Sequence, residues 1–481
     1  MINSKGTVFP VTTLSLAGTT EEVVVGGRDK FGLLPVAFEG IKTIGVIGWG
    51  SQGPAQAQNL RDSLEGTNIR VKVGLQIGSS SFAKAEVAGF SVADGTLGEM
   101  YDVIGESDLV ILLISDAAQA ENYERILATM EPGATLGLSH GFLLGHMKNV
   151  GAKFRPDINV IMVAPKGMGP SVRRLYEQGK DGNGAGINAS YAVEQEVTDN
   201  ARNIALGWAV AIGSPYVFPT TLEMEYRSDI FGERGVLLGA IWGSTEALNT
   251  HFITEQSGTR AEAFMRSAMS LTGPISKAIS QGGLLEVANR AREGRFYETM
   301  GATYKAAKLL LAEIYDEVAS GREIGSVVDA TKRLKGGSMS KVDGAPMWRT
   351  GERVRADNPE VALDPTTAGV YIGIMMAQVD LLKERGHGWS EICNESIIEA
   401  VDSLNPYMAK RGVDYMVDNC STTARLGTRK WGPRFNQMVT SEVLPNVQGW
   451  TDDTEKWFKE HVIHGALAET MKLRPPVDIA V

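Results

Sequence analysis

Cysteine is nearly absent from this sequence, because only Cys393 and Cys420 occur among 481 residues. No Cys-x-x-Cys spacing exists, which argues against a thiolate zinc site. So few thiols suit a reducing compartment, and we interpret both as small buried hydrophobic side chains. The chain is long enough to bury a large core without disulfides.

Long apolar runs and an excess of positive charge are also lacking. No apolar run approaches the roughly 20 residues of a membrane span, and the N-terminus shows neither a signal-peptide pattern nor an Arg- and Ser-rich transit segment. The net charge of −10 argues against nucleic acid as the main partner, since phosphate backbones require basic stripes. An anionic small ligand stays open, because local fields matter more than net charge.

Short apolar runs alternate with helical patterns from Ile41 onward. The runs are residues 43–48, 70–75, 109–115, 134–139 and 159–164. Near-continuous apolar strands between helices predict a parallel sheet covered on both faces. We therefore expect an α/β doubly wound domain of Rossmann type over residues 1–219, with residues 1–40 as a polar lead-in.

Long helical patterns dominate after Pro219, and strand-like runs become scarce. This change predicts an all-α domain over residues 220–481. A Gly-x-x-x-Gly segment from Gly235 recurs from Gly369, and the acids Glu246 and Asp380 follow at the same spacing. Either chance similarity between helices or an internal duplication explains these matches.

A glycine-rich turn follows the first apolar run. Gly48, Gly50 and Gly53 form G-x-G-x-x-G between a strand pattern and a helical pattern, the context in which this motif binds a dinucleotide. The first glycine makes the tight turn, the second lets the backbone approach the pyrophosphate, and the third lets helix and strand pack closely. The helix N-terminus then holds the negative charge.

The second strand ends at Gln76 without the Asp or Glu that usually holds the ribose of NAD. The hydroxyls of Ser79 and Ser81 at a helix N-terminus suit a 2′-phosphate, which a carboxylate would repel. This pattern favours NADP(H) over NAD. A helix cap with solvated neighbours is the other interpretation of these serines.

Two pairs of carboxylates have the i, i+4 spacing that places both members on one helix face. They are Asp229 with Glu233, at the expected start of a helix, and Glu395 with Glu399. Four such carboxylates can converge on Mg²⁺, which prefers oxygen ligands. Each pair alone fits a solvated helix face equally well, although apolar neighbours flank both pairs.

Three further polar side chains occupy positions typical of ligand sites. His140 and Lys166 each follow a predicted strand, at the edge of the sheet where doubly wound folds bind ligands. A His bonded to backbone and an exposed loop Lys are the alternatives. Ser421 has no partner visible from sequence, and an ordinary loop or cap hydroxyl explains it as well.

Seven segments in order resemble ketol-acid reductoisomerase (acetohydroxy-acid isomeroreductase) of the long, plant-like class. They are residues 40–63, 112–124, 136–146, 164–190, 225–235, 394–406 and 416–428. The resemblance implies a duplicated, knotted helical domain, which agrees with the repeat above. It also implies a homodimer or homotetramer, located in the plastid stroma for a plant or algal protein and otherwise in the cytoplasm.

The resemblance further implies a two-step reaction on 2-acetolactate or 2-aceto-2-hydroxybutyrate, in the biosynthesis of valine, leucine and isoleucine. First, the tertiary hydroxyl loses its proton while an alkyl group migrates to the adjacent carbonyl. NADPH then delivers hydride to the new ketone. Two Mg²⁺ ions would polarise the two neighbouring oxygens, and the Rossmann domain would place the nicotinamide.

The resemblance assigns roles to individual residues. Asp229, Glu233, Glu395 and Glu399 would hold the metal, with Asp229 bridging the ions and Glu399 also relaying a proton. Lys166 would orient a water or hydroxide at the metal, His140 would shape the nicotinamide side, and Ser421 would bind substrate. The cofactor contacts would be Gly48, Trp49, Gly50, Ser51, Gln52, Gly53, Gln76, Ser79, Ser81, Ser115, Asp116, Ala117, Ala118, Gln119, His140 and Gly169.

The sequence departs from the plant-like pattern after the second strand. Gln76, Ile77 and Ser80 stand where that pattern has Arg, Lys and Arg, so cations that would pair with a 2′-phosphate are missing. Trp242 likewise replaces a histidine common in plants. Two other functions share the glycine turn: a metal-free hydroxy-acid dehydrogenase, and a non-catalytic redox sensor. The dehydrogenase does not explain two acidic pairs, and the complete set of site motifs argues against the sensor.

Overall fold

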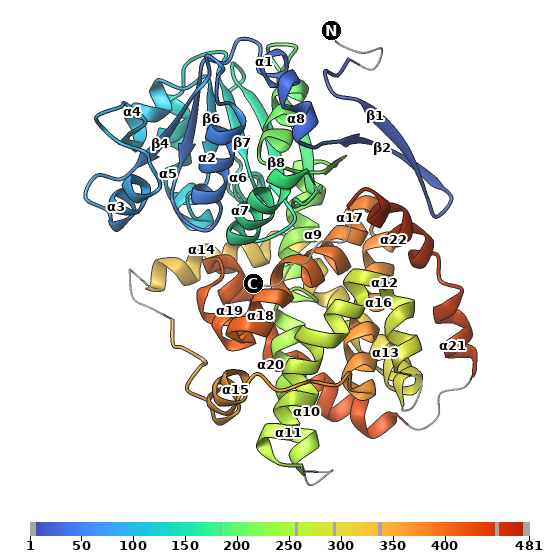
Figure 1. The fold of residues 1–481 in the computed structure, drawn as a ribbon. Helices are drawn as coiled ribbons and strands as arrows, with labels where there is room; N and C mark the ends of the chain where they lie inside the picture. The colour runs from blue at the N-terminus through green and yellow to red at the C-terminus, as the bar shows by residue number, and fades with distance from the viewer. Residues whose placement is uncertain are drawn as a thin grey trace. The chain divides into compact units, whose positions relative to one another are not determined.

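The computed structural model describes residues 6–182, 184–254, 258–291, 295–334, 339–447 and 452–474. The chain forms two compact units. The first contains Met1–Tyr226 together with Met471–Val477, and the second contains Arg227–Thr470 together with Asp478–Val481. Figure 1 traces the chain from its blue N-terminus to its red C-terminus.

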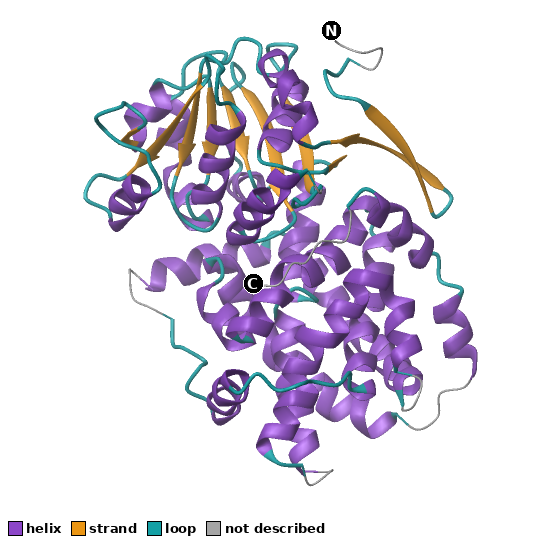
Figure 2. Cartoon of the chain, viewed as in Figure 1, coloured by secondary structure: helices purple, strands orange, loops and turns teal. Residues whose placement is uncertain are grey.

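A ten-stranded sheet forms the centre of the first unit (Figure 2). Its strands are β1 (Val11–Leu16), β2 (Thr19–Val25), β3 (Thr43–Ile47), β4 (Arg70–Leu75), β5 (Leu97–Glu99), β6 (Leu109–Leu112), β7 (Thr135–Leu138), β8 (Asn159–Pro165), β9 (Ala189–Gln195) and β10 (Tyr216–Pro219). Their spatial order is β1-β2-β10-β9-β8-β7-β6-β3-β4-β5. The strands from β5 to β8 are all parallel, in the order of a dinucleotide-binding doubly wound sheet.

Helices cover both faces of this sheet. Leu109 and Ile111 of β6 pack into a core with α1, α2 and α8, whereas Val110 and Leu112 pack into a second core with α4, α5 and α6. Successive strand residues point to opposite faces, so both faces are buried, as the continuous apolar runs predicted. The helices of this unit are η1 (Arg28–Leu33), α1 (Leu34–Ala37), α2 (Gln52–Ser63), α3 (Ser80–Val87), α4 (Met100–Gly105), α5 (Asp116–Thr129), α6 (Phe142–Val150), α7 (Gly169–Gln178), η2 (Gly179–Asp181) and α8 (Ala201–Ala211).

The N-terminal segment is a hairpin rather than the polar lead-in that the sequence suggested. Strands β1 and β2 pair antiparallel, and β2 joins β10 through Val24 and Val25. The connecting turn uses Ala17 and Gly18, with φ of 48° and 82°, and lacks the Asn-Gly or Asp-Gly pair that marks such turns in sequence. The five predicted strands are confirmed as β3, β4, β6, β7 and β8.

The second unit contains helices and no strand among its described residues, as predicted for the chain after Pro219. Its elements are α9 (Leu222–Arg234, which begins in the first unit), α10 (Gly239–Thr254), α11 (Arg260–Phe264), η3 (Met265–Met269), η4 (Leu271–Ile275), α12 (Ser276–Arg290), α13 (Phe296–Ala319), α14 (Arg322–Leu334), α15 (Pro346–Ala356), α16 (Pro365–Glu384), α17 (Trp389–Cys393), η5 (Asn394–Ile398), η6 (Ala400–Leu404), α18 (Asn405–Arg411), α19 (Val413–Asn419), α20 (Thr422–Met438), η7 (Val439–Val443), η8 (Leu444–Asn446), α21 (Asp452–Lys459) and α22 (Ile463–Lys472). Among the helices described, none has the length and apolarity needed to cross a membrane.

Early and late helices of the second unit pack in a reciprocal pattern. Helix α10 packs on α20, while the later helix α16 packs on the earlier α13. In the same way η4 packs on α18, and α12 packs on η6. Helices α10 and α13, from the first half of this unit, therefore take their main partners from its second half, while η4 and α12 also contact elements from that half.

Candidate functional site

The glycine turn has the backbone that its motif predicted. Gly48 has φ of 114°, and a Cβ there would lie 2.6 Å from the carbonyl oxygen of Leu113. A Cβ on Gly53, in the first turn of α2, would collide with the carbonyl oxygen of Gly48. Beside Gly50 a Cβ would meet nothing within 4 Å. The turn is thus closed by two glycines and open at the middle one, where a pyrophosphate needs room.

The loop after β8 packs directly against this turn. The Gly169 amide donates to Ser51 Oγ over 3.3 Å, and Gln52 Nε2 donates to the Gly167 carbonyl over 2.8 Å. A side chain on Gly169 would collide with the Ser51 carbonyl. Three predicted cofactor residues, Ser51, Gln52 and Gly169, are therefore brought together from segments more than 100 residues apart.

Strands β4 and β6 lie on either side of β3, so the loops after them flank the turn. Ser79 caps the N-terminus of α3, yet its Oγ is buried with no hydrogen-bond partner among the described residues. Gln76 and Ser80 are exposed, Ser81 is half-buried, and the Ile77 side chain is 71% exposed. An unpaired hydroxyl at a helix N-terminus fits an anionic group such as a 2′-phosphate.

The remaining predicted cofactor residues lie at the start of α5 and on the turn. Ser115 precedes the helix, and Asp116, Ala117, Ala118 and Gln119 form its first turn. Gln119 Nε2 donates to the Ile114 carbonyl over 2.9 Å, which holds this turn to the end of β6. The Trp49 ring packs edge-on against Phe90, with centroids 5.7 Å apart.

His140 and Lys166 converge on a buried carboxylate that the sequence analysis missed. Glu225 accepts a hydrogen bond from Lys166 Nζ at 3.3 Å, and His140 Nδ1 lies 3.3 Å from its other oxygen. The Gly141 amide donates to the same oxygen over 2.7 Å. Glu225 lies within the segment that carries the family resemblance, one helical turn before Asp229. The available signal was the recurrence of acids every four residues at Glu225, Asp229 and Glu233.

These contacts fix the charge of Glu225. Burial by itself raises the pKa of a carboxyl group, but Lys166 and His140 oppose it and bring the pKa of Glu225 down to about 2. The Lys166 side chain is almost fully buried, so this is a buried ionic group rather than an exposed loop lysine. The exposed-lysine interpretation of Lys166 is therefore wrong.

A group of three carboxylates gathers in the second unit. Carboxylate oxygens of Asp229, Glu395 and Glu399 lie within 4.8 Å of one another. Asp229 belongs to the last two turns of α9 rather than to the start of a helix, because the helix begins earlier, at Leu222. Glu395 is fully buried in η5, and Glu399 follows η5 directly and is 8% exposed. A solvated helix face is excluded for this second pair.

Glu233 stands beside this group but has cationic and hydroxyl partners of its own. Its Oε2 accepts from the buried Arg234 guanidinium over 2.7 Å, and its Oε1 accepts from Ser421 Oγ over 3.4 Å. Ser421 also caps α20 by accepting from the Ala424 amide. The predicted substrate residue is thus both a helix cap and a neighbour of a predicted metal ligand.

The negative charge of these acids also affects the pKa of the neighbouring Cys420 thiol. Burial raises its pKa, and the negative charges of Glu233, Glu399 and Asp229 raise it further, to about 12. Oxygen donors with a concentrated negative charge are the ligands that Mg²⁺ prefers. The donor set therefore fits a hard divalent cation and does not fit a thiolate metal such as zinc in a cysteine site.

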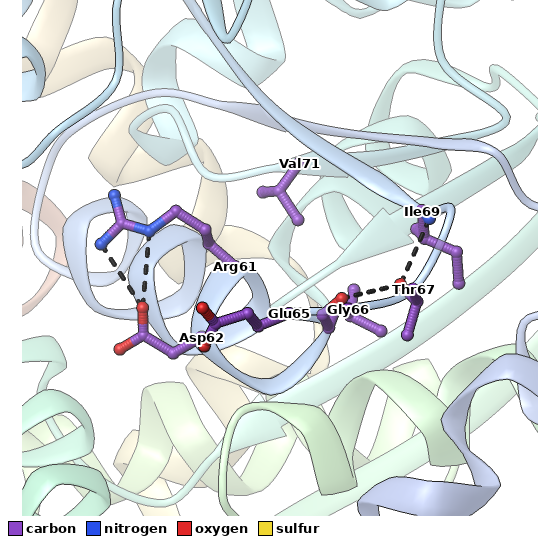
Figure 3. A pocket seen from close by; sticks show the side chains of 8 residues that line it. Arg61, Asp62, Glu65, Gly66, Thr67, Ile69 and Val71 are labelled. Carbon is purple, nitrogen blue, oxygen red and sulfur yellow. Dashed lines mark hydrogen bonds and ion pairs between the residues drawn. The ribbon is translucent and has the colours of Figure 1, made fainter.

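A hollow of about 350 Å³ lies away from these residues, at the amino-terminal edge of the sheet (Figure 3). Its walls come from the end of α2, the following loop and the start of β4. Arg61 and Asp62 pair with each other at its rim. Since the glycine turn lies at the carboxyl ends of the strands, this hollow is separate from the cofactor residues.

Comparison with known proteins identifies the chain. Residues 40–216 match the profile described as "Acetohydroxy acid isomeroreductase, NADPH-binding domain", and residues 222–360 and 366–471 match "Ketol-acid reductoisomerase, C-terminal domain". The chain belongs to the ketol-acid reductoisomerase family. It is therefore an oxidoreductase with isomerase activity that acts in branched-chain amino-acid biosynthesis, as the sequence resemblance implied.

Two plant enzymes and one solved structure show how far the similarity extends. The chain is 53% identical to "Ketol-acid reductoisomerase, chloroplastic" of Pisum sativum, over 98% of this chain and 84% of that protein. It is 52% identical to the enzyme of the same description from Spinacia oleracea, over 98% of this chain and 82% of that protein. The structure of an "NADH-preferring ketol-acid reductoisomerase from an uncultured archean" is 26% identical, with a TM-score of 0.59, over 69% of this chain and 98% of that one.

Proposed function

We propose that this ketol-acid reductoisomerase requires Mg²⁺ and uses NADPH to convert 2-acetolactate and 2-aceto-2-hydroxybutyrate to dihydroxy acids. The observation that carries the metal requirement is the convergence of Asp229, Glu395 and Glu399 within 4.8 Å. Alkyl migration between adjacent carbons offers no bond for a side-chain nucleophile to make. It requires instead that negative charge on one oxygen and electron deficiency at the next carbon both be stabilised.

Asp229, Glu233, Glu395 and Glu399 would hold two Mg²⁺ ions, with Asp229 between them. When bound, the ions supply Lewis acidity at the two neighbouring oxygens of the substrate. Arg234 and Ser421 orient the Glu233 carboxylate, and Ser421 would also contact substrate. Glu399 would accept the proton of the tertiary hydroxyl, since it is the more exposed acid of its pair.

The loops around the glycine turn would bind NADPH. Gly48, Gly50 and Gly53 would bind the pyrophosphate. Trp49, Ser51, Gln52, Gln76, Ser79, Ser81, Ser115, Asp116, Ala117, Ala118, Gln119, His140 and Gly169 would complete the cradle. His140 would shape the nicotinamide side, and Lys166 would orient a water. Glu225 adds to this assignment, because it holds both cationic side chains in place.

We assign NADP binding to residues 1–219, and metal and substrate binding to residues 220–481. The packing of α10 on α20 and of α16 on α13 favours an internal duplication with interlocked halves, which is what a knotted helical domain requires. With both halves in one chain, each chain would complete its own site, and we assign the enzyme to a homodimer or homotetramer of such chains. The chloroplastic descriptions of the pea and spinach relatives favour the plastid stroma.

Steady-state assays with purified enzyme test this function. We expect acetolactate and NADPH to be consumed only when Mg²⁺ is present, and EDTA to abolish the rate. The Glu395→Gln variant is expected to lose at least 1000-fold in kcat, the loss typical when preorganised electrostatic stabilisation is removed, on the order of 4 kcal/mol. Its NADPH dissociation constant, measured by fluorescence, is expected to equal that of the wild type. EDTA-insensitive turnover would overturn the metal assignment.

A further inference from the structure

A row of buried polar side chains crosses the second unit from α13 to α9. The Tyr315 hydroxyl lies 2.9 Å from His387 Nε2, and His387 Nδ1 lies 2.9 Å from Glu391 Oε2. Ser228 Oγ donates to the other oxygen, Glu391 Oε1, over 2.9 Å. The imidazole tautomer that donates Nδ1–H to Glu391 leaves Nε2 to accept from Tyr315. One carboxylate therefore joins a serine, a histidine and a tyrosine from separate segments.

Each member of this row is almost completely buried. Exposures are 0% for Ser228, 1% for His387, 3% for Tyr315 and 4% for Glu391. Apolar side chains of similar volume would usually stabilise such a position as well or better. A fully hydrogen-bonded polar network can instead hold the elements around it in one arrangement.

The two ends of the Ser228–Glu391 hydrogen bond lie next to the two acidic pairs. Ser228 immediately precedes Asp229 on α9. Glu391 lies one helical turn before Glu395, and α17 continues directly into η5. A one-residue shift of either helix would break this 2.9 Å hydrogen bond, so the contact constrains the separation of Asp229 from Glu395.

We propose that Glu391 is a positioning residue for the metal site, held in place by His387 and Tyr315, an inference that rests on the proposed metal function. Glu391 is not one of the four carboxylates proposed to hold the metal. Ser228 transmits its position to Asp229, and the shared helix transmits it to Glu395. Partners behind metal ligands commonly change metal affinity by 10- to 100-fold when removed.

A second tyrosine–carboxylate–histidine group in the same unit provides a matched control. The Tyr304 hydroxyl donates to Asp380 Oδ2 over 2.7 Å, and His461 Nε2 lies 2.9 Å from Asp380 Oδ1. None of these three residues is adjacent in sequence to a proposed metal ligand. Tyr304→Phe therefore also removes one tyrosine hydrogen bond, here to a carboxylate rather than to an imidazole, without altering the alignment of the acidic pairs.

The experiment measures Mn²⁺ affinity by the loss of the free-ion EPR signal in full-length protein without substrate. We expect Ser228→Ala to raise the Mn²⁺ dissociation constant about 10-fold and Tyr315→Phe to raise it several-fold. The double variant is expected to match Ser228→Ala alone, since both changes act through Glu391 and are not additive. Tyr304→Phe is expected to lower the melting temperature while leaving Mn²⁺ affinity unchanged.

The outcomes separate this inference from the function on which it rests. If wild type binds Mn²⁺ and Glu395→Gln does not, but Ser228→Ala and Tyr315→Phe bind as wild type, the positioning role is overturned and the metal site stands. If wild type itself binds no Mn²⁺, the metal site fails and the positioning role fails with it. Should Ser228→Ala not fold, Tyr315→Phe against Tyr304→Phe decides, and equal Mn²⁺ affinity in these two variants overturns the inference.

Discussion

Glu225 and Glu395 are both buried carboxylates, yet their surroundings differ. Glu225 lies between Lys166 and His140, which together hold its charge in place. Glu395 instead shares its site with two further acids, Asp229 and Glu399. A carboxylate among cations is already neutralised, whereas three gathered carboxylates attract a divalent cation. At the scale of residues, these two arrangements make different predictions for pH and for ligands.

Glu225→Gln is expected to change the acid sensitivity of the fold. The pKa of Glu225 is lowered from 4.5 to about 2 in the folded state, so its stabilising effect is full above about pH 4.5 and is lost as the pH falls toward 2. The variant leaves the buried Lys166 ammonium without its carboxylate and is expected to lose about 3 kcal/mol at pH 7. Between pH 5 and 3 the gap in melting temperature between wild type and variant is expected to narrow.

Glu223→Gln is the control for that prediction. Glu223 is a third exposed and pairs with Lys148 at the surface, so its loss is expected to change stability by less than about 1 kcal/mol at any pH. Parallel melting-temperature profiles for wild type and Glu225→Gln would contradict the charge assignment of Glu225.

Gln76 offers a test of cofactor preference at one exposed position. Gln76→Arg would add a cation near Ser79, whose hydroxyl has no hydrogen-bond partner in the described part of the chain. The variant is expected to lower the KM for NADPH about 10-fold through charge-assisted hydrogen bonds to the 2′-phosphate. Gln76→Glu is the opposite-charge control and is expected to raise the KM for NADPH while leaving that for NADH unchanged or lower. An equal change in the KM for NADPH and for NADH in either variant would show that position 76 does not distinguish the 2′-phosphate.

Single residues were predictable where their chemistry is local in sequence. Gly48 and Gly53 are recognised by the spacing of their motif, and in the structure both have close contacts that exclude a side chain. Glu225 was missed because its partners His140 and Lys166 lie 85 and 59 residues away. Glu391 was missed for the same reason, since Ser228 lies 163 residues before it. Contacts of this range depend on the fold, which no local pattern encodes.

At the scale of elements, close helix packing in the second unit depends on glycine. A Cβ on Gly373 of α16 would lie 2.6 Å from the Met300 carbonyl oxygen and 2.7 Å from the Thr303 Cβ of α13. On the other pair of helices, Trp242 of α10 packs over Gly432 of α20 and donates its indole N–H to Glu246. These glycines let the backbones of paired helices approach each other.

Gly373→Ala is accordingly expected to destabilise the protein by about 2 kcal/mol, because the added methyl group overpacks the α13–α16 contact. Gly325→Ala on α14 is the matched control. A Cβ on Gly325 meets nothing within 4 Å, so alanine is expected to stabilise that helix by about 0.5–1 kcal/mol. Denaturant unfolding of the two variants measures the change in the free energy of unfolding for each. A stabilising effect of Gly373→Ala would contradict the close packing.

Elements were predictable in proportion to the regularity of their hydrophobic pattern. The buried parallel strands read as continuous apolar runs and were found within one to three residues of their bounds. The β1–β2 hairpin was not recognised, because Glu21 and Glu22 of β2 lie in a partly exposed strand with little apolar pattern. Strand β9 was missed because its exposed half carries Glu194 and Gln195.

The second unit as a whole takes its stability from helices that are distant in sequence. A chain ended after residue 411 lacks α20, the main partner of α10, whereas a chain ended after residue 447 keeps it. We expect the shorter chain to lose cooperative unfolding of the helical unit by near-UV circular dichroism, and the longer one to retain it. Cooperative unfolding in the shorter chain would contradict the reciprocal packing.

Reciprocal packing also means that some helices are synthesised well before the helices they pack against. Helix α10 ends at Thr254 and its partner α20 begins at Thr422, so at about 5–20 residues per second the ribosome needs roughly 10–30 s to supply the partner. Early in that interval α10 can pack against its neighbours α11 and η3. The face of α10 that α20 covers in the folded enzyme stays exposed until α20, in the last third of the chain, has been made.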